Sequence, residues 1–450
     1  MRLLFAILLL LTQMASALTL ADVLQAVERN HPKLRKAELE LEVARAKTLE
    51  KQGAFDPSIG FYTLTQRYNS EDKAKTFWGT GLAYGYLDRS GMKLQAGYRN
   101  HQGAVKSPLS NTGQAGEFFA EMKLPLLRGA SINEKAAEEQ RAMVGERSAG
   151  AYYQLARLQT LLAAGSAYWG WVGSTRQLEL VETSLQLAQQ RLDNVAERVA
   201  AGDLARVNQL EAEQTVAKRR EMVVKARREV EKAQLKLAYY LWNSQGQAQE
   251  LPSSAPEELP QPTGLEPAQL AQAEVEALRL RPEVSSLEFA LERIAIDEAL
   301  AKNDQLPQLD LTLSPGIDPT GIGISVKAGL ELVIPLATRG ADGRLLAARL
   351  KTDQLALEQV ETIRTIVLEV RDAASAVVTA VERYQQASQA LALATQLEEA
   401  EKLRFELGEG TLFLVNQREN ARLDAALSLL ELQAEYAQYR LLLEAVGGRL

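Results

Sequence analysis

The sequence predicts a mostly α-helical chain with a smaller β component, organised as two internal repeats. Three observations support this prediction. Apolar residues recur in alternating steps of three and four over long stretches, which is typical of coiled-coil helices. Other stretches alternate apolar and polar residues one by one, as amphipathic strands do. The order helix, strands, helix, glycine break, helix occurs twice along the 450 residues.

Composition argues against several classes of protein. The chain has 46% apolar and 24% charged residues, which argues against disorder, and its formal net charge of −7 gives no reason to expect nucleic acid as a partner. An enzyme would need a cluster of reactive groups, but there are only two histidines and no cysteine. The acidic pair Glu398 and Glu399 fits a solvated helix face. We therefore expect no catalysis, no cofactor and no metal site.

Residues 1–17 have the pattern of a cleaved signal peptide. Arg2 precedes an apolar run, and the small residues "ASA" at Ala15 to Ala17 suit a signal peptidase. The run is far shorter than the roughly 20 residues that span a bilayer. Without cysteine the exported chain has no thiol for lipid attachment, so we do not expect a lipoprotein.

The first repeat is predicted over residues 18–243. A helix begins near Pro32, strands occupy residues 55–125, and long helices reverse at a tip near Gly202. Between Gly129 and Gly202 the helical pattern would extend on the order of 100 Å at about 1.5 Å per residue. Within the strand region, Thr80 to Asn100 form a hairpin that turns at Asp88 to Gly91, and we expect it to extend a sheet on the extracellular side.

The second repeat, residues 265–450, follows a proline-rich linker at residues 244–264. A helix begins near Pro282, strands occupy residues 306–336, and long helices reverse at a tip near Gly408. Apart from the added hairpin, the two repeats supply about four strands. The smallest membrane barrel needs roughly eight strands, so several chains would have to close one barrel together.

The motifs that accompany this plan resemble those of the TolC-like outer-membrane efflux protein family, over essentially the whole mature chain. They are the starts "NHPKL" and "LRPEV", the strand ends "KLPLLRG" and "VIPLATRG", and two Arg-x-x-x-Gly tips. The resemblance implies a homotrimer, with a barrel of four strands per chain in the outer membrane and a coiled-coil tunnel across the periplasm. It further implies the exit duct of a tripartite efflux or type I secretion system, served by a membrane fusion adaptor and a proton-driven or ATP-driven inner-membrane pump.

The tips are the adaptor-docking surface that the resemblance implies. Their residues are Arg198, Gly202, Asp203, Arg404, Gly408, Glu409 and Gly410. Glycine accepts the left-handed backbone that ends a helix, so Gly202 and Gly408 would let the helices reverse. Arg198 and Arg404 either cap helix-end carbonyls or face the adaptor.

The predicted periplasmic aperture departs from the family. The two positions at which well-gated members carry aspartates are Leu414 and Gln417, and those of the latching tyrosine and arginine are Phe405 and Gly410. Asn208 offers one weak bond. We expect closure by apolar packing around Phe413 and Leu414 and insensitivity to multivalent cations, unless Glu406 or Glu409 turns inward.

A second class of function shares the heptad pattern. A periplasmic coiled-coil spacer or adhesin without channel activity would have the helices but would not need alternating aromatic strands. Washing membranes with alkali distinguishes the two, because a spacer is released and a membrane barrel is not.

Overall fold

A computed structural model describes residues 18–70, 73–103, 112–249, 251, 258–320 and 323–450. The predicted signal peptide and part of the predicted linker lie outside the described residues. The chain divides into two compact units. One comprises Glu38–Tyr152 and Ser285–Glu361, and the other comprises Met1–Ala37, Tyr153–Val284 and Thr362–Leu450. The long helices α3 (Glu134–Ala200) and α7 (Arg339–Glu406) contribute residues to both.

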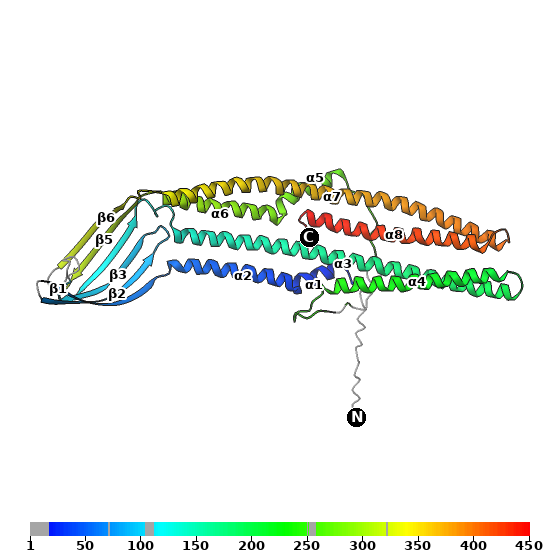
Figure 1. Cartoon of the computed structure of the whole chain (residues 1–450), viewed down its shortest axis with the longest axis horizontal. Coiled ribbons are helices and arrows are strands. Elements are labelled where there is room, and N and C mark those ends of the chain that lie inside the picture. Colours follow the sequence, from blue (N-terminus) through cyan, green and yellow to red (C-terminus); the bar gives the residue numbers. More distant parts are fainter. Residues whose placement is uncertain (1–17, 71–72, 104–111, 250, 252–257, 321–322) are drawn as a thin grey trace, which may run out of the picture. The chain divides into compact units, whose positions relative to one another are not determined.

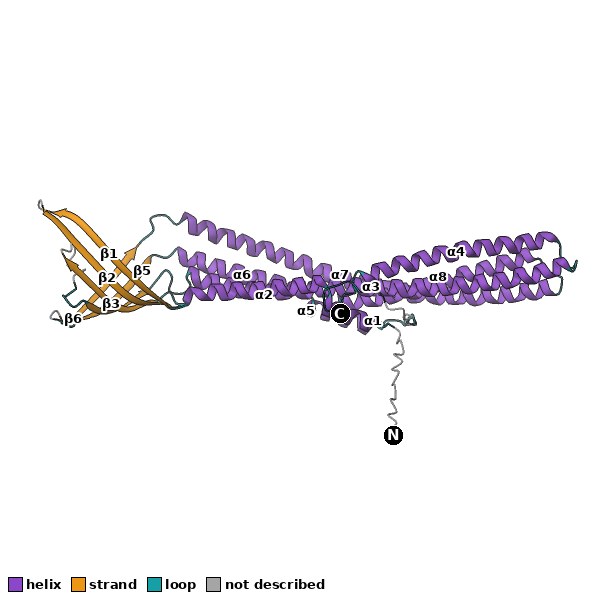
Figure 2. Cartoon of the chain, turned by 90° about the horizontal axis from the view of Figure 1, so that it is seen from below, coloured by secondary structure: helices purple, strands orange, loops and turns teal. Residues whose placement is uncertain are grey.

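The first unit contains a single antiparallel sheet whose strands follow one another in chain order, from β1 to β6 (Figures 1 and 2). The strands are β1 (Ser58–Ser70), β2 (Lys73–Leu87), β3 (Lys93–Gly103), β4 (Glu117–Pro125), β5 (Gln308–Asp318) and β6 (Gly323–Val333). All lie in the two predicted strand regions. The expectation of four sheet strands per chain is wrong, because the predicted hairpin is inserted in the middle of the sheet as parts of β2 and β3.

The predicted position of that hairpin is also wrong. Its turn, from Asp88 to Met92, is closed by a hydrogen bond from the Asp88 amide to the Met92 carbonyl of 2.8 Å. The Arg89 carbonyl accepts from Asn133, just before α3, and the Arg89 guanidinium pairs with Glu139 inside α3. The turn therefore lies at the helix end of the sheet. β1 leads away from the preceding helix, so β2 must return toward the helices before β3 can leave again.

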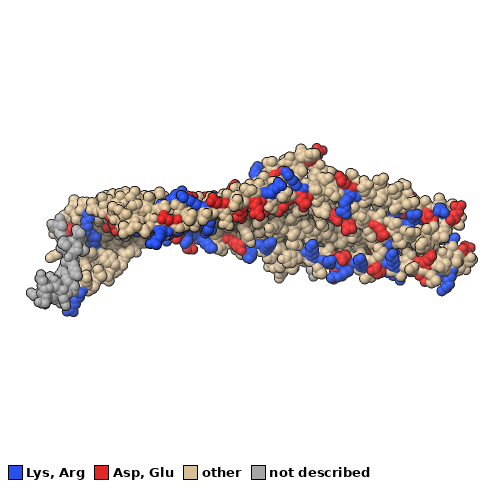
Figure 3. Space-filling model, turned by 45° about the horizontal axis from the view of Figure 1, so that its top comes forward, with Lys and Arg blue, Asp and Glu red and all other residues tan. Residues whose placement is uncertain are grey.

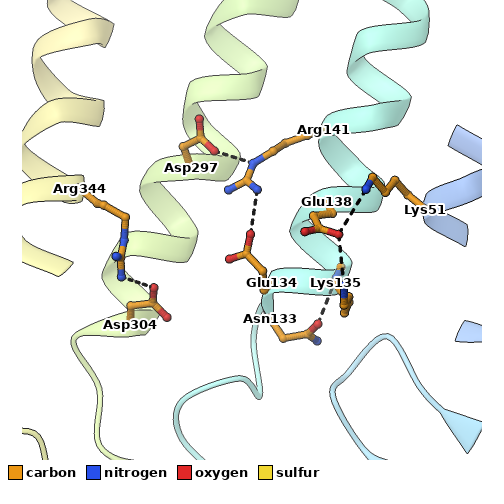
Figure 4. A network of polar contacts seen from close by, with 10 residues as sticks. Lys51, Asn133, Glu134, Lys135, Glu138, Arg141, Asp297, Asp304 and Arg344 are labelled. Carbon is orange, nitrogen blue, oxygen red and sulfur yellow. Dashed lines mark hydrogen bonds and ion pairs between the residues drawn. The ribbon is translucent and has the colours of Figure 1, made fainter. Parts of the chain in front are cut away.

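The helical part of this unit holds most of α2 (Pro32–Gln52) and α6 (Pro282–Asp304). It also includes the N-terminal turns of α3, up to Tyr152, and of α7, up to Glu361. A small apolar core joins α3 and α6 through Val144, Ile296 and Leu300. Ion pairs also join the helices of this unit, as Figure 4 shows: Arg141 of α3 pairs with Asp297 of α6 at 2.6 Å, and Arg344 of α7 pairs with Asp304 of α6 at 2.6 Å. On the face drawn in Figure 3, positive and negative side chains are interspersed over the helices.

The other unit is helical and contains α1 (Leu20–Asn30), α4 (Arg206–Ala238), α5 (Pro267–Leu280) and α8 (Leu412–Val446). One core gathers Val23 and Val27 of α1 around the fully buried Tyr168 of α3, and a second joins α5, α7 and α8. Helices begin at Pro32 and Pro282, as predicted, and each proline also follows the end of another helix. His31 and Arg281 have extended backbones, with ψ of 127° and 129°, because a following proline disfavours helical geometry.

None of the helices in the described part of the chain combines the length and the apolar composition needed to cross a bilayer.

Candidate functional site

The sheet has two chemically different faces. One row of cross-strand partners runs through all six strands and is entirely apolar or aromatic: Phe61, Leu82, Tyr98, Phe118, Ile317 and Ile324. Neighbouring rows on the same face add Ile59, Tyr84, Val326, Leu330 and Leu332, all of them exposed. Ile324 and Leu330 are 76% and 70% exposed. An apolar surface that crosses a whole sheet indicates contact with a partner or a membrane.

The opposite face carries charge and glycine. Arg99 and Glu117, directly opposite each other on β3 and β4, pair at 2.6 Å, and the Ser325 hydroxyl donates to Glu117 at 2.6 Å. Lys123 lies between Asp310 and Glu331, at 2.9 Å from each carboxylate. This face is therefore compatible with water and ions, and the sheet separates a polar side from an apolar one.

Glycines on the polar face make room for its larger side chains. A methyl group on Gly81 would lie 2.4 Å from the Tyr62 ring, and one on Gly316 would lie 2.0 Å from the Glu117 carboxylate. Both distances are far below van der Waals contact. The glycines that weaken the strand pattern in the sequence thus allow bulky polar groups to lie flat against the sheet.

Both predicted helix tips end in the same glycine motif. The Gly202 amide donates to the Val199 carbonyl and the Asp203 amide to the Arg198 carbonyl, at 3.1 and 2.9 Å. At the second tip, the amides of Gly408 and Glu409 donate in the same way to Phe405 and Arg404. Gly202 and Gly408 have φ of 84° and 80°, so the prediction of left-handed glycines is confirmed. In each Arg-x-x-x-Gly motif, the arginine supplies the carbonyl that accepts this last hydrogen bond, and the glycine four residues later reverses the chain.

The two tip arginines differ in what their side chains contact. Arg198 lies over the Phe405 ring at 5.5 Å from its centre. Arg404 pairs with Glu401 at 3.5 Å and donates to the Glu409 carbonyl at 3.5 Å. The Glu409 carbonyl lies in the turn after α7 ends at Glu406, so both roles that the sequence left open for these arginines stay predictions.

A small apolar core joins the two tips. Val195 of α3, Ala212 of α4 and Leu412 of α8 are buried in it, and Phe405 packs against them. Leu412 and Val415, which the sequence analysis did not single out, are 0% and 1% exposed. The signal was the helical spacing of three residues between Leu412 and Val415, directly after Thr411, whose side chain caps the start of α8.

The residues predicted for the aperture differ in burial. Phe413 is 62% exposed, Leu414 is partly buried, and Gln417 is exposed. Asn208 donates to the Ala205 carbonyl one turn away, at 3.3 Å. Apolar closure around Phe413 and Leu414 therefore stays a prediction about an assembly of chains.

Behind the tips, an open groove of about 570 Å³ runs along α3 and α7. It is lined by Leu187, Gln190, Asn194, Glu197, Lys402 and Glu406, among others. Its lining is mostly polar or charged, with a few apolar side chains such as Leu187.

A buried charge network lies next to this groove. Glu419 of α8 pairs with Arg191 of α3 and with Lys402 of α7, the latter at 3.3 Å. Lys402 also pairs with Glu398 at 2.6 Å, and Glu398 pairs with Arg422. The expectation that Glu398 faces solvent is wrong, because it is 4% exposed and holds two cations. Its neighbour Glu399 is exposed as expected.

The pKa of Glu419 reflects these contacts. Burial alone would raise it, but the hydrogen bond and charge of Arg191, together with the charge of Lys402, outweigh burial and hold the pKa below its ordinary value. Glu419 is therefore ionised at neutral pH and joins three helices.

Among the described residues, no group of three or more histidine, aspartate or glutamate side chains is arranged to hold a metal ion.

We expect Gly408→Ala to destabilise the chain by about 1 to 2 kcal/mol, because a Cβ in the left-handed conformation meets the backbone. No other atom lies within 4 Å of the added methyl, so the cost is purely conformational. Gly170→Ala is the matched control: it lies inside α3, also with open space, and should be stabilising. Thermal unfolding followed by helical circular dichroism measures both. A Gly408→Ala protein as stable as the parent would contradict the role assigned to this glycine.

The chain resembles several solved structures of bacterial membrane proteins. A membrane protein from Pseudomonas aeruginosa superposes with a TM-score of 0.69 and 17% identity, over 95% of this chain and 92% of its own. The outer membrane protein VceC of Vibrio cholerae has a TM-score of 0.67 and 15% identity, over 95% of this chain and 96% of its own. The open state of the MtrE outer membrane channel of Neisseria gonorrhoeae has a TM-score of 0.66 and 18% identity, over 96% of this chain and 89% of its own.

The sequence matches no family model and no curated protein. At the identities found among the structures, the likeness establishes the fold, which is TolC-like.

Proposed function

We propose that this chain, which has the fold of TolC-like outer-membrane channels, is the exit duct of a tripartite efflux or type I secretion system. It would act as a homotrimer built from chains with two internal repeats. The observation that carries the proposal is the sheet with one apolar face and one polar, glycine-rich face. Such a wall serves a pore, since lipid contacts one side and water the other.

In this proposal the apolar face contacts outer-membrane lipid and the polar face lines the exit. A periplasmic spacer or adhesin would leave the apolar face in water, where exposed apolar surface of this extent promotes aggregation. The helices would then form the periplasmic tunnel through which substrates arrive from the inner-membrane pump.

The tips are the proposed docking surface for a membrane fusion adaptor. Asp203, Glu409 and Gly410 lie in the two reversing turns, and the groove along α3 and α7 opens directly behind them. In this proposal, the helical hairpin of an adaptor docks along this open groove. The proposed aperture lies at the same end and includes Phe413.

Labelling of single cysteines tests the placement of the sheet, because the chain has no cysteine of its own. Gln114→Cys lies next to the start of β4, at the end of the sheet away from the helices, and Ser90→Cys lies in the Asp88 to Met92 turn at the helix end. In intact cells, a membrane-impermeant maleimide should label Gln114→Cys and not Ser90→Cys. Ser90→Cys should react after the outer membrane is permeabilised.

Two outcomes would contradict the proposal. If neither cysteine reacts in intact cells, the Gln114 end of the sheet is not at the cell surface. If Ser90→Cys alone reacts, the sheet is inserted the other way round.

A further inference from the structure

The β2–β3 hairpin is part of the sheet and does not simply cover it. β1 pairs with β2 over its whole length, from Ser58 opposite Gly85 to Ser70 opposite Lys73. β4 pairs with β3 on one side and β5 on the other. A four-stranded wall would need β1 to pair with β4, but that edge of β4 is occupied by β3. Removing the hairpin from the wall would therefore break two strand pairings.

The hairpin shares the two-faced chemistry of the other strands. Leu82 and Tyr98 lie in the apolar row that crosses the sheet, and Gly81 and Arg99 lie opposite each other in the polar row. A hairpin that folded over the pore or into the extracellular solvent would not need to pair in register with β1 on one side and β4 on the other.

The turn of the hairpin is fastened to the helices. The Arg89 guanidinium donates two hydrogen bonds to Glu139, at 2.8 and 2.7 Å, and lies over the Phe55 ring at 4.8 Å from its centre. Glu139 is only 5% exposed. Paired bonds of this kind from arginine to a buried carboxylate are among the stronger polar contacts in proteins, so the hairpin is held in the plane of the sheet.

Within the described part of the chain, neither edge of the sheet has a second strand partner: β1 pairs with β2 alone, and β6 pairs with β5 alone. β1 runs away from the helices and β6 runs back toward α7, so the β6 edge of one copy and the β1 edge of another would meet antiparallel. Both edges carry exposed apolar residues on the same face, including Ile59 on β1 and Ile324 on β6, while Leu64 and Val333 are exposed on the other face. A second copy of this chain therefore fits each edge in both direction and chemistry.

We infer that the β1 edge of one copy pairs with the β6 edge of the next, so that three copies of the six-stranded sheet close a wall of 18 strands. This inference rests on the proposed homotrimer. A wall of 18 strands encloses a wider exit than the wall of 12 strands that four strands per chain would form. With strands about 4.8 Å apart and tilted by about 40°, 18 strands enclose a radius of about 18 Å, against about 12 Å for 12 strands.

Distances between spin labels distinguish the two walls. A nitroxide at Leu330→Cys on β6 points outward from the apolar face, in a chain without other cysteines. Each label lies at a distance from the three-fold axis equal to the wall radius plus the length of the label arm. The distance between two equivalent labels of the trimer is the square root of three times that value. We expect about 40 Å for 18 strands and about 30 Å for 12. Pulsed electron double resonance on the purified trimer measures this distance.

A second label at Leu82→Cys, on the same face of β2, tests whether the hairpin is in the wall. The inference expects both sites to report about the same distance of 40 Å, because both strands then lie on one closed wall. A distance near 30 Å at Leu330→Cys, or clearly different distances at the two sites, would overturn the 18-strand wall while leaving the trimeric channel intact. Absence of any distance between chains would overturn both.

Discussion

Replacing Glu419 by alanine is expected to destabilise the helical unit by about 1 to 3 kcal/mol, because it leaves the largely buried Arg191 guanidinium without its carboxylate partner. Glu419 is 13% exposed and is held by Arg191, itself 20% exposed, and by Lys402. These three side chains come from α8, α3 and α7, so the loss should loosen the packing of one helical hairpin against the other. Thermal unfolding of the purified protein, followed by helical circular dichroism, measures the effect.

Glu399→Ala is the matched control for this prediction. It removes the same carboxylate from an exposed position next to the network and should change stability by less than about 0.5 kcal/mol. The double change Arg191→Met and Glu419→Leu should recover much of the lost stability, since apolar groups of similar size can replace a buried pair. Equal effects of Glu419→Ala and Glu399→Ala would show that the network does not hold the hairpins together.

The same residue predicts a pH dependence. The pKa of Glu419 is lower in the folded chain than its ordinary value, so the folded state favours the ionised form. Its stabilising contribution is therefore fully present above the ordinary glutamate range and is lost as the pH falls through the lowered pKa. The parent protein should lose more stability on acidification than Glu419→Ala does.

In the proposed channel, replacing Leu330 by arginine is expected to prevent assembly in the outer membrane. A charge on the lipid-facing side of a membrane strand costs about 2 to 4 kcal/mol at mid-depth, and a trimer would carry three of them. Leu330 is 70% exposed on the apolar face of β6. The amount of trimer in outer-membrane fractions, resolved without heating on a denaturing gel, measures the outcome.

The neighbouring residue supplies the control. Gly329 lies one position earlier on β6, so its side chain would project from the polar face, where no atom lies within 4 Å of an added methyl. Gly329→Arg should therefore assemble like the parent protein. If both variants assemble equally well, the apolar face does not contact lipid, and the proposed function loses its main support.

Local patterns were sufficient for the parts of this fold that depend on near neighbours in the chain. The reversals at Gly202 and Gly408 follow from the backbone freedom of glycine, and the helix starts at Pro32 and Pro282 follow from the restriction that proline places on the preceding residue. Strand regions were predictable for the same reason, because alternation with a period of two is visible in the sequence itself.

Pairing between distant segments was not predictable in this way. Whether β2 and β3 enter the sheet, and at which end their turn lies, depends on hydrogen bonds to β1 and β4 and on the contacts of Arg89 with the start of α3. Alternation with a period of two indicates that a strand has two different faces, but it does not indicate which strand pairs with it.

Burial was likewise decided by tertiary structure. Glu398 and Glu399 are identical residues side by side on one helix, yet Glu398 is enclosed by Lys402 and Arg422 while Glu399 faces solvent. The sequence by itself determined the element types, the two reversing glycines and the two-faced strands, because these depend on backbone geometry within a few residues. The tertiary structure decided the six-stranded order of the sheet, the position of the hairpin turn and the buried charges behind the tips, because these depend on contacts between segments far apart in the chain.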